Sequence, residues 1–156
     1  YYGDKERKYR PQTELDAQMS LPYCLSVGLL NDGHVRMSDF YLDRLSDPKV
    51  LAIADKVTAE GDTELDKVPL KPMSMPAIVT VTTKDGRRLE KRVDHQKGDP
   101  RNPFSEDDFI NKFRECTNDI LAPDSQQVVI DNIMDLDKCD DLDTLVSALI
   151  VRKSEA

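Results

Sequence analysis

Apolar side chains recur at helical spacing in several segments of this chain. Residues about one turn apart lie on the same face of a helix, so this spacing predicts amphipathic helices. The most regular case is the stripe from Leu142 to Ile150, in which apolar residues fall on one face throughout. The pattern predicts helices at about 20–31, 47–54, 105–116, 125–138 and 141–151.

Capping and turn residues set the ends of these helices. We expect the first helix to begin near Ser20, because Pro22 then falls in its first turn, where proline is tolerated. A longer helix that starts after Thr13 and is broken by Pro22 is the alternative. Asn31-Asp32-Gly33 is a typical helix stop. Two further helix starts are marked by capping side chains: Asp47-Pro48 and Ser105-Glu106-Asp107-Asp108.

From Ala77 the period of the hydrophobic pattern changes to two, which is typical of β-strands. Two such runs flank Asp85-Gly86, a pair that favours the tight turn of a hairpin. A hairpin is only marginally stable alone, so we expect other strands to pair with it, and 57–60 and 5–10 are the candidates. The sequence therefore predicts an α+β fold, in which a small antiparallel sheet including a hairpin at about 77–94 is packed by four to five helices.

Charge narrows the class of protein. The chain has 22 basic and 30 acidic residues, so its formal net charge is −8. Non-specific nucleic-acid binding needs a basic face that displaces counterions from phosphates, and this balance argues against it. No apolar run is long enough to span a membrane as a helix. We therefore expect neither nucleic acid nor a membrane as a partner.

The cysteines and histidines are too few and too dispersed for a disulfide framework or a metal site. Cys24, Cys116 and Cys139 form no C-x-x-C pair, which predicts reduced thiols and a cytoplasmic location. His34 and His95 lack partners at metal-ligand spacing, so we expect loop or solvent histidines and no metal. The N-terminus has neither an initiator Met nor an apolar leader, and we expect the chain to be part of a longer protein.

Residue types alone indicate no complete active site. The turn at 98–100 could offer backbone N–H groups to an anion, but a turn that leads into a helix cap is the better interpretation. The acidic run at 135–143 lacks the glycine and the final glutamate of an EF-hand, and it fits solvated helix ends. On the hairpin, Arg88, Glu90 and Arg92 are expected on an exposed outer face.

The segment from Glu14 to Leu30, ELDAQMSLPYCLSVGLL, carries a stronger signal. It resembles a signature of the 2-methylcitrate dehydratase family, the MmgE/PrpD group, which also contains cis-aconitate decarboxylases and iminodisuccinate epimerases. Further motifs of that family follow in the same order at 47–50, 80–87, 98–106 and 112–113. An ordered series of motifs over most of residues 11–121 is far more specific than any one of them.

The resemblance implies a large all-helical domain followed by a smaller α+β lid, with the active site in the cleft between them. Residues 1–156 correspond to the C-terminal lid, and the upstream all-helical domain lies outside this chain. The family reaction removes a proton together with a β-hydroxyl or a carboxylate from a small di- or tricarboxylate. Most members need no obligatory cofactor or metal, and the whole protein is expected to be a homodimer.

The function implied by the resemblance is that of a 2-methylcitrate dehydratase-like hydro-lyase of propionate metabolism, and this chain alone is expected to be inactive. A decarboxylase or an epimerase of the same family is an alternative. A free-standing α+β binding or assembly module, related to the lid only in structure, is another. Because the acid–base residues that distinguish these reactions lie upstream, the sequence leaves the choice open.

The resemblance also places Tyr23 at the substrate cleft as a catalytic residue, and Ser20, one turn earlier, as a substrate-binding residue. A phenol can hydrogen-bond a carboxylate or polarise a leaving hydroxyl while it stays neutral at physiological pH. From the residue pattern alone, a tyrosine at the boundary between core and surface is the simpler interpretation of Tyr23. We expect the substrate's charge to be met mainly by the upstream domain.

Overall fold

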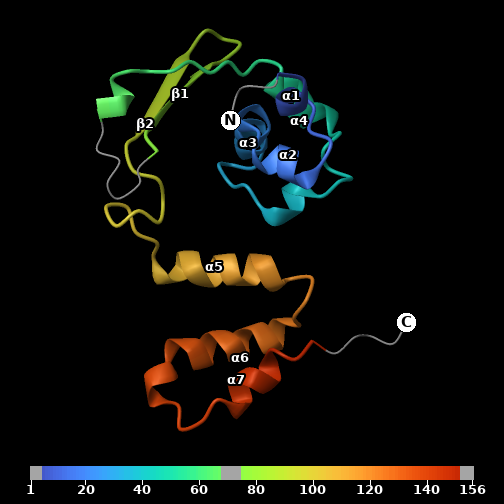
Figure 1. Cartoon of the computed structure of the whole chain (residues 1–156), viewed down its shortest axis with the longest axis vertical. Helices are drawn as coiled ribbons and strands as arrows, with labels where there is room; N and C mark the ends of the chain where they lie inside the picture. The colour runs from blue at the N-terminus through green and yellow to red at the C-terminus, as the bar shows by residue number, and fades with distance from the viewer. Residues whose placement is uncertain (1–4, 68–74, 152–156) are drawn as a thin grey trace. The chain divides into compact units, whose positions relative to one another are not determined.

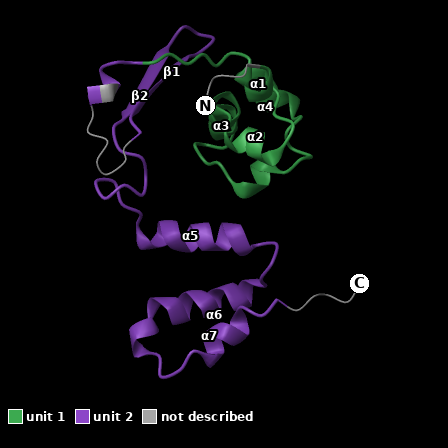
Figure 2. Ribbon diagram, in the orientation of Figure 1, with its two compact units in different colours: residues 1–61 green, residues 62–156 purple. Residues whose placement is uncertain are grey.

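The computed structural model describes residues 5–67 and 75–151, which divide between two compact units, Tyr1–Gly61 and Asp62–Ala156 (Figure 2). We call them the N-terminal unit and the C-terminal unit. The described residues form seven α-helices and one two-stranded antiparallel sheet (Figure 1), which confirms the predicted α+β class. The helices outnumber the predicted four to five because α1 and α2, of five residues each, are too short to show a hydrophobic period.

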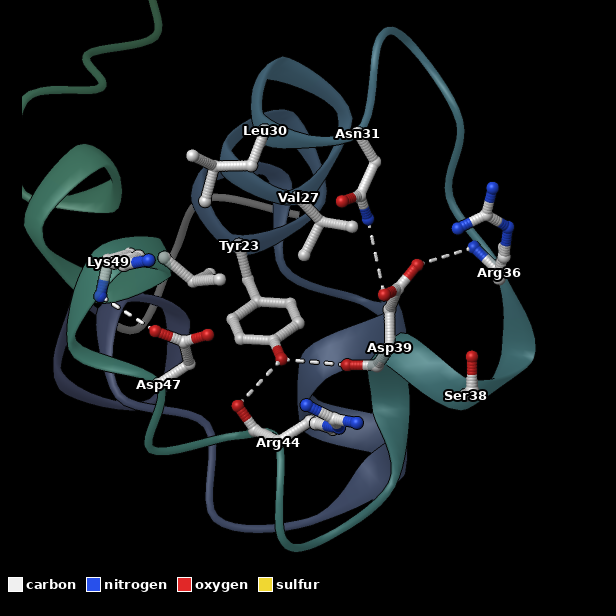
Figure 3. A pocket seen from close by; sticks show the side chains of 11 residues that line it. Tyr23, Val27, Leu30, Asn31, Arg36, Ser38, Asp39, Arg44, Asp47 and Lys49 are labelled. Carbon is white, nitrogen blue, oxygen red and sulfur yellow. Dashed lines mark hydrogen bonds between the residues drawn. The ribbon is translucent and has the colours of Figure 1, made fainter.

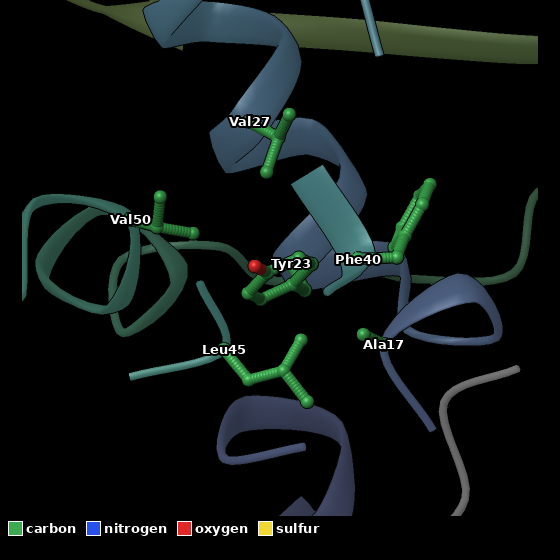
Figure 4. Close-up of a cluster of buried hydrophobic side chains, with 6 residues drawn as sticks. All are labelled: Ala17, Tyr23, Val27, Phe40, Leu45 and Val50. Carbon is green, nitrogen blue, oxygen red and sulfur yellow. The ribbon is translucent and has the colours of Figure 1, made fainter. Parts of the chain in front are cut away.

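The N-terminal unit is a group of short helices around one small apolar core (Figure 4). Its elements are α1 (Lys5–Tyr9), α2 (Glu14–Gln18), α3 (Leu21–Leu30), the 3-10 helix η1 (Met37–Phe40) and α4 (Pro48–Ala54). The buried core residues are Ala17, Tyr23, Val27, Phe40, Leu45 and Val50. The core therefore lies where α3, α4 and the segment between them meet.

α3 begins and ends where the sequence predicts. The Ser20 side chain accepts a hydrogen bond from the Tyr23 backbone N–H at 3.1 Å, so Ser20 caps the helix and Pro22 lies in its first turn. At the other end Gly33, with a φ of 90°, donates its N–H to the Gly28 carbonyl at 2.7 Å. This turn ends the helix and leads into the segment that carries η1.

The segment 5–10 is largely helical, with α1 at Lys5–Tyr9, and the prediction of a strand there is wrong. Contacts with distant residues fix it: the Tyr9 hydroxyl donates to the Val57 carbonyl at 2.6 Å, and the Arg10 guanidinium makes two 2.8 Å hydrogen bonds to the Asp55 carboxylate. A charged segment without a hydrophobic period gives no sign of such contacts. The other candidate strand, 57–60, is irregular.

The predicted hairpin is present in the C-terminal unit. β1 (Ala77–Thr82) pairs antiparallel with β2 (Arg88–Val93), and Gly86, with a φ of 85°, lies in the turn. Within the described residues the sheet has two strands, so the prediction of additional strands is wrong. As predicted, one exposed face of β2 carries Arg88, Glu90 and Arg92.

α5 begins at the predicted capping box. The Asp108 N–H donates to the Ser105 hydroxyl at 3.2 Å, and the Ser105 N–H donates to the Asp108 carboxylate at 2.7 Å. The Lys97 ammonium lies 2.8 Å from the same carboxylate and, together with the Ser105 hydrogen bonds, lowers the pKa of Asp108 to about 2. The cap thus joins the start of α5 to the loop that precedes it.

The helical part of the C-terminal unit departs from the predicted bounds. The predicted helix at 125–138 is divided, because the chain tightens to a 3-10 turn after Met134. The last helix is shorter than its apolar stripe: Leu145 is buried, whereas Val146 and Ile150 are more than half exposed. No helix in the described ranges is long and apolar enough to cross a membrane. The helices and 3-10 helices of the C-terminal unit are η2 (Leu65–Lys67), α5 (Glu106–Thr117), α6 (Pro123–Met134), η3 (Leu136–Lys138) and α7 (Asp143–Ala148).

Candidate functional site

A pocket of about 420 Å³ opens beside α3 in the N-terminal unit (Figure 3). Its wall comprises one face of α3, the segment around η1 and the start of α4. Tyr23 and an apolar part formed by Val27, Leu30 and Val50 lie on the side of the helices. The polar part of the wall consists of Asn31, Arg36, Ser38, Asp39, Arg44, Asp47 and Lys49.

Tyr23, the predicted catalytic residue, lies between the core and this pocket. Its side chain is only 1% exposed, and its hydroxyl faces the main-chain carbonyls of Asp39, at 2.8 Å, and Arg44, at 3.3 Å. The first acceptor, Asp39, lies in η1, and the second, Arg44, lies in the segment that follows it. A single phenol therefore fixes two points of the pocket wall.

Burial also sets the protonation state of Tyr23. Desolvation, with a smaller contribution from the nearby Asp39 carboxylate, raises the pKa of Tyr23 to about 12. The phenol is therefore neutral at physiological pH, where it is a hydrogen-bond donor and cannot serve as a phenolate base. This state is the one that the sequence analysis assigned to a catalytic tyrosine.

Ser20, the predicted substrate-binding residue, is buried at the start of α3 and lies outside the residues that line the pocket. Its hydroxyl donates to the Lys8 carbonyl and accepts from the Tyr23 N–H. The hydroxyl thus holds the first turn of α3, on which Tyr23 lies. A contact between Ser20 and substrate stays a prediction.

Three basic residues, Arg36, Arg44 and Lys49, line the pocket, and the sequence analysis did not single them out as site residues. All three residues are exposed, and each lies in a different segment. Arg36 precedes η1, Arg44 follows it, and Lys49 is in the first turn of α4. No hydrophobic period or motif spacing joins them. The only sequence signal was the family-like motif at 47–50, which includes Lys49.

The two acidic residues of the wall are engaged with their own segments. The Asp39 carboxylate accepts hydrogen bonds from the Arg36 N–H at 2.7 Å and from the Asn31 side-chain amide at 3.3 Å. The Asp47 carboxylate accepts from the Lys49 N–H at 2.8 Å and caps α4. Both carboxylates therefore shape the backbone that presents the basic side chains.

The loop at 98–103, which begins with the turn that could offer backbone N–H groups to an anion, is held by its own side chains. The Asp99 side chain is buried and accepts from the Arg101 N–H at 2.9 Å and from the Arg101 guanidinium at 2.8 and 2.9 Å. These bonds lower the pKa of Asp99 to about 2. The interpretation as a turn that leads into the cap of α5 is confirmed. Among the described residues, no group of three or more His, Cys, Asp or Glu is arranged to hold a metal ion.

Comparison with known proteins identifies the class of protein to which this chain belongs. The family model described as the MmgE/PrpD C-terminal domain matches residues 1–138. The chain therefore belongs to the MmgE/PrpD family and contains its C-terminal domain. This result confirms the family inferred from the ordered motifs.

The curated relatives include two cis-aconitate decarboxylases. The protein from Mus musculus is 29% identical over 142 residues, which is 87% of this chain and 28% of the relative. The protein from Homo sapiens is 28% identical over 145 residues, with the same 87% and 28% coverage. The match thus spans less than a third of the length of either relative.

Proposed function

We propose that this chain is the lid domain of a lyase that acts on a small di- or tricarboxylate, together with an upstream all-helical domain. The observation that carries the proposal is the match along residues 1–138 to the MmgE/PrpD C-terminal domain, with cis-aconitate decarboxylases among the relatives. The polar pocket, with its neutral phenol and three basic residues, supports a small anionic ligand.

Decarboxylation of cis-aconitate is the reaction we propose first, because both relatives are named for it. In that reaction the bond between a carboxylate and its carbon breaks, carbon dioxide leaves, and a proton takes its place. Dehydration of 2-methylcitrate, which the motif at 14–30 suggested, is the second candidate. Both substrates are small tricarboxylates, so both require a site that compensates several negative charges.

Within this reaction we propose Tyr23 as a catalytic residue that donates a hydrogen bond to a substrate carboxylate. The longer of its two contacts, 3.3 Å to the Arg44 carbonyl, is the one that a substrate oxygen would replace. Its raised pKa keeps the proton on the phenol throughout the physiological range. The role proposed for Ser20 is to position Tyr23 through the cap of α3, and its direct contact with substrate remains to be tested.

The whole protein, incubated separately with cis-aconitate and with 2-methylcitrate, tests this proposal. We expect release of carbon dioxide from cis-aconitate, or water loss from 2-methylcitrate, at enzyme-like rates. The chain of 156 residues should turn over neither substrate. Turnover by the chain alone would contradict its assignment as a lid, and failure of the whole protein with both substrates would contradict the lyase.

A further inference from the structure

We propose that the pocket of the N-terminal unit is a carboxylate-recognition site, in which Arg36, Arg44 and Lys49 hold a tricarboxylate. The choice of a tricarboxylate rests on the proposed function. The site itself rests on the composition and geometry of the pocket, and all of the residues that line it belong to this chain. The chain should therefore bind the ligand without the upstream domain.

The first argument is the local balance of charge. The chain as a whole carries a net charge of −8, yet the pocket is lined by three basic and two acidic side chains, a local excess of one positive charge. The pocket therefore differs in sign from the chain as a whole. A local excess of positive charge raises the local concentration of anions and favours their binding.

The second argument is that, among the described residues, the pocket's acids form no ion pair with its bases. Asp39 and Asp47 are hydrogen-bonded to N–H groups of their own segments rather than to the basic side chains. In the described residues the one ion pair among the three bases joins Arg44 to Asp43 at 3.9 Å, between two largely exposed side chains. Exposed pairs of this length contribute little, so an anionic ligand can displace the contact.

The third argument is that the wall is held in shape before a ligand arrives. The Tyr23 hydroxyl spans the Asp39 and Arg44 carbonyls, and the two acidic caps fix the backbone at Arg36 and Lys49. A wall with fixed backbone loses less conformational entropy when it binds a ligand. The volume of about 420 Å³ also lies within the range of small-molecule sites.

The chemistry of the side chains selects carboxylates. A guanidinium presents a planar pair of N–H donors that matches a carboxylate, and a lysine ammonium adds a mobile positive charge. All three basic residues line the pocket, and in Figure 3 Arg36, Arg44 and Lys49 lie on different sides of Tyr23. Three cations on separate sides suit a ligand that carries more than one carboxylate, rather than a single small anion.

Titration of the chain with tricarballylate, a saturated tricarboxylate, followed by amide NMR spectra, tests the proposal. We expect saturable shifts at Asn31, Ser38 and Lys49, with millimolar affinity that falls as salt rises. The trimethyl ester, which has the same skeleton and no charge, should leave these signals in place. Absence of saturable shifts, or shifts centred outside the pocket, would overturn the site.

Matched variants separate a built site from general attraction. Arg36→Gln and Lys49→Gln should each weaken tricarballylate binding by roughly threefold or more, as loss of one charge-assisted contact predicts. Lys56→Gln removes the same charge from an exposed residue outside the pocket and should change the affinity very little. Equal weakening by all three variants would show non-specific electrostatics and contradict the proposal.

The outcomes distinguish this site from the proposed function. If the chain binds tricarballylate at the pocket but the whole protein turns over neither cis-aconitate nor 2-methylcitrate, the lyase fails and the site stands. If the whole protein is active but the chain shows no saturable binding, the site fails and the lyase stands.

Discussion

Tyr23 joins the apolar core of the N-terminal unit to the polar pocket beside it. Its ring packs in the core, with its centroid 6.2 Å from that of Phe40, while its hydroxyl faces the Asp39 and Arg44 carbonyls. A buried phenol is stable only where its hydroxyl finds a partner, and these carbonyls supply it. The residue predicted as catalytic therefore also holds the shape of the pocket.

Replacement of this hydroxyl separates the two roles. Tyr23→Phe should lower the free energy of unfolding of the chain by about 1–2 kcal/mol, because the main-chain carbonyls of Asp39 and Arg44 lose the single O–H donor that they share while the ring remains. Urea denaturation followed by circular dichroism measures this change. Tyr9→Phe, which removes the hydroxyl bonded to the Val57 carbonyl, is the control outside the pocket and should also destabilise the chain.

If the whole protein is the proposed lyase, only Tyr23→Phe should lower its kcat/KM for the substrate. A value within about twofold of the wild type would remove Tyr23 from the site. A matching loss in Tyr9→Phe would show that reduced stability, rather than a lost contact with substrate, explains the effect.

The raised pKa of Tyr23 predicts how stability responds to alkaline pH. The ordinary value is 10.0 and the folded value is about 12, so folding favours the neutral phenol. Its contribution to stability is complete below pH 10 and is lost as the pH rises through the interval up to about 12. The difference in unfolding free energy between wild type and Tyr23→Phe, measured against pH, should shrink across that interval. A constant difference would contradict the burial of this hydroxyl.

Local chemistry explains which elements were predictable. α3, α4 and α5 each begin at a capping side chain adjacent in sequence, and the hairpin turns at an Asp-Gly pair. α1 depends instead on contacts between residues far apart in sequence. The Tyr9 hydroxyl bonds to the Val57 carbonyl, and the Arg10 side chain bonds to Asp55. Neighbouring residues encode the first kind of boundary, and only the folded unit determines the second.

The loop before α5 illustrates a local requirement that the structure makes testable. Gly98 has a φ of 93°, and a Cβ added there would lie 2.6 Å from the Phe104 ring. Gly98→Ala should therefore reduce the free energy of unfolding by about 1–2 kcal/mol from the left-handed backbone alone, with the ring contact adding to it. Thermal denaturation measures this change. The control is Gly61→Ala, because a Cβ added at Gly61 meets nothing within 4 Å, and this variant should leave the free energy of unfolding nearly unchanged. Equal stability of the two variants would contradict the geometry of this loop.

Over the whole molecule, the sequence led to the family and to Tyr23 but not to the rest of the pocket. Motif order found the family because motifs are local strings of residues. Arg36, Arg44 and Lys49 come together only because the chain turns after α3 and again before α4. The sequence analysis expects the upstream domain to meet most of the substrate's charge. The structure adds that this chain also has basic residues in a pocket of its own.

Apolar side chains also remain exposed on the C-terminal unit. Leu142, Val146 and Ile150 are all more than half exposed, although they form the most regular stripe of the sequence. Exposed apolar surface of this kind is typical of interaction sites. The homodimer implied by the family stays a prediction for the whole protein.

The most direct test of the account is the KM of the whole protein for cis-aconitate in the double variant Arg36→Gln/Lys49→Gln, compared with Lys56→Gln. If the lid presents these cations to a tricarboxylate, the double variant should raise KM by about tenfold, while kcat changes less and the control keeps both parameters. A whole protein that acts on cis-aconitate with the same KM in all three forms would contradict the account.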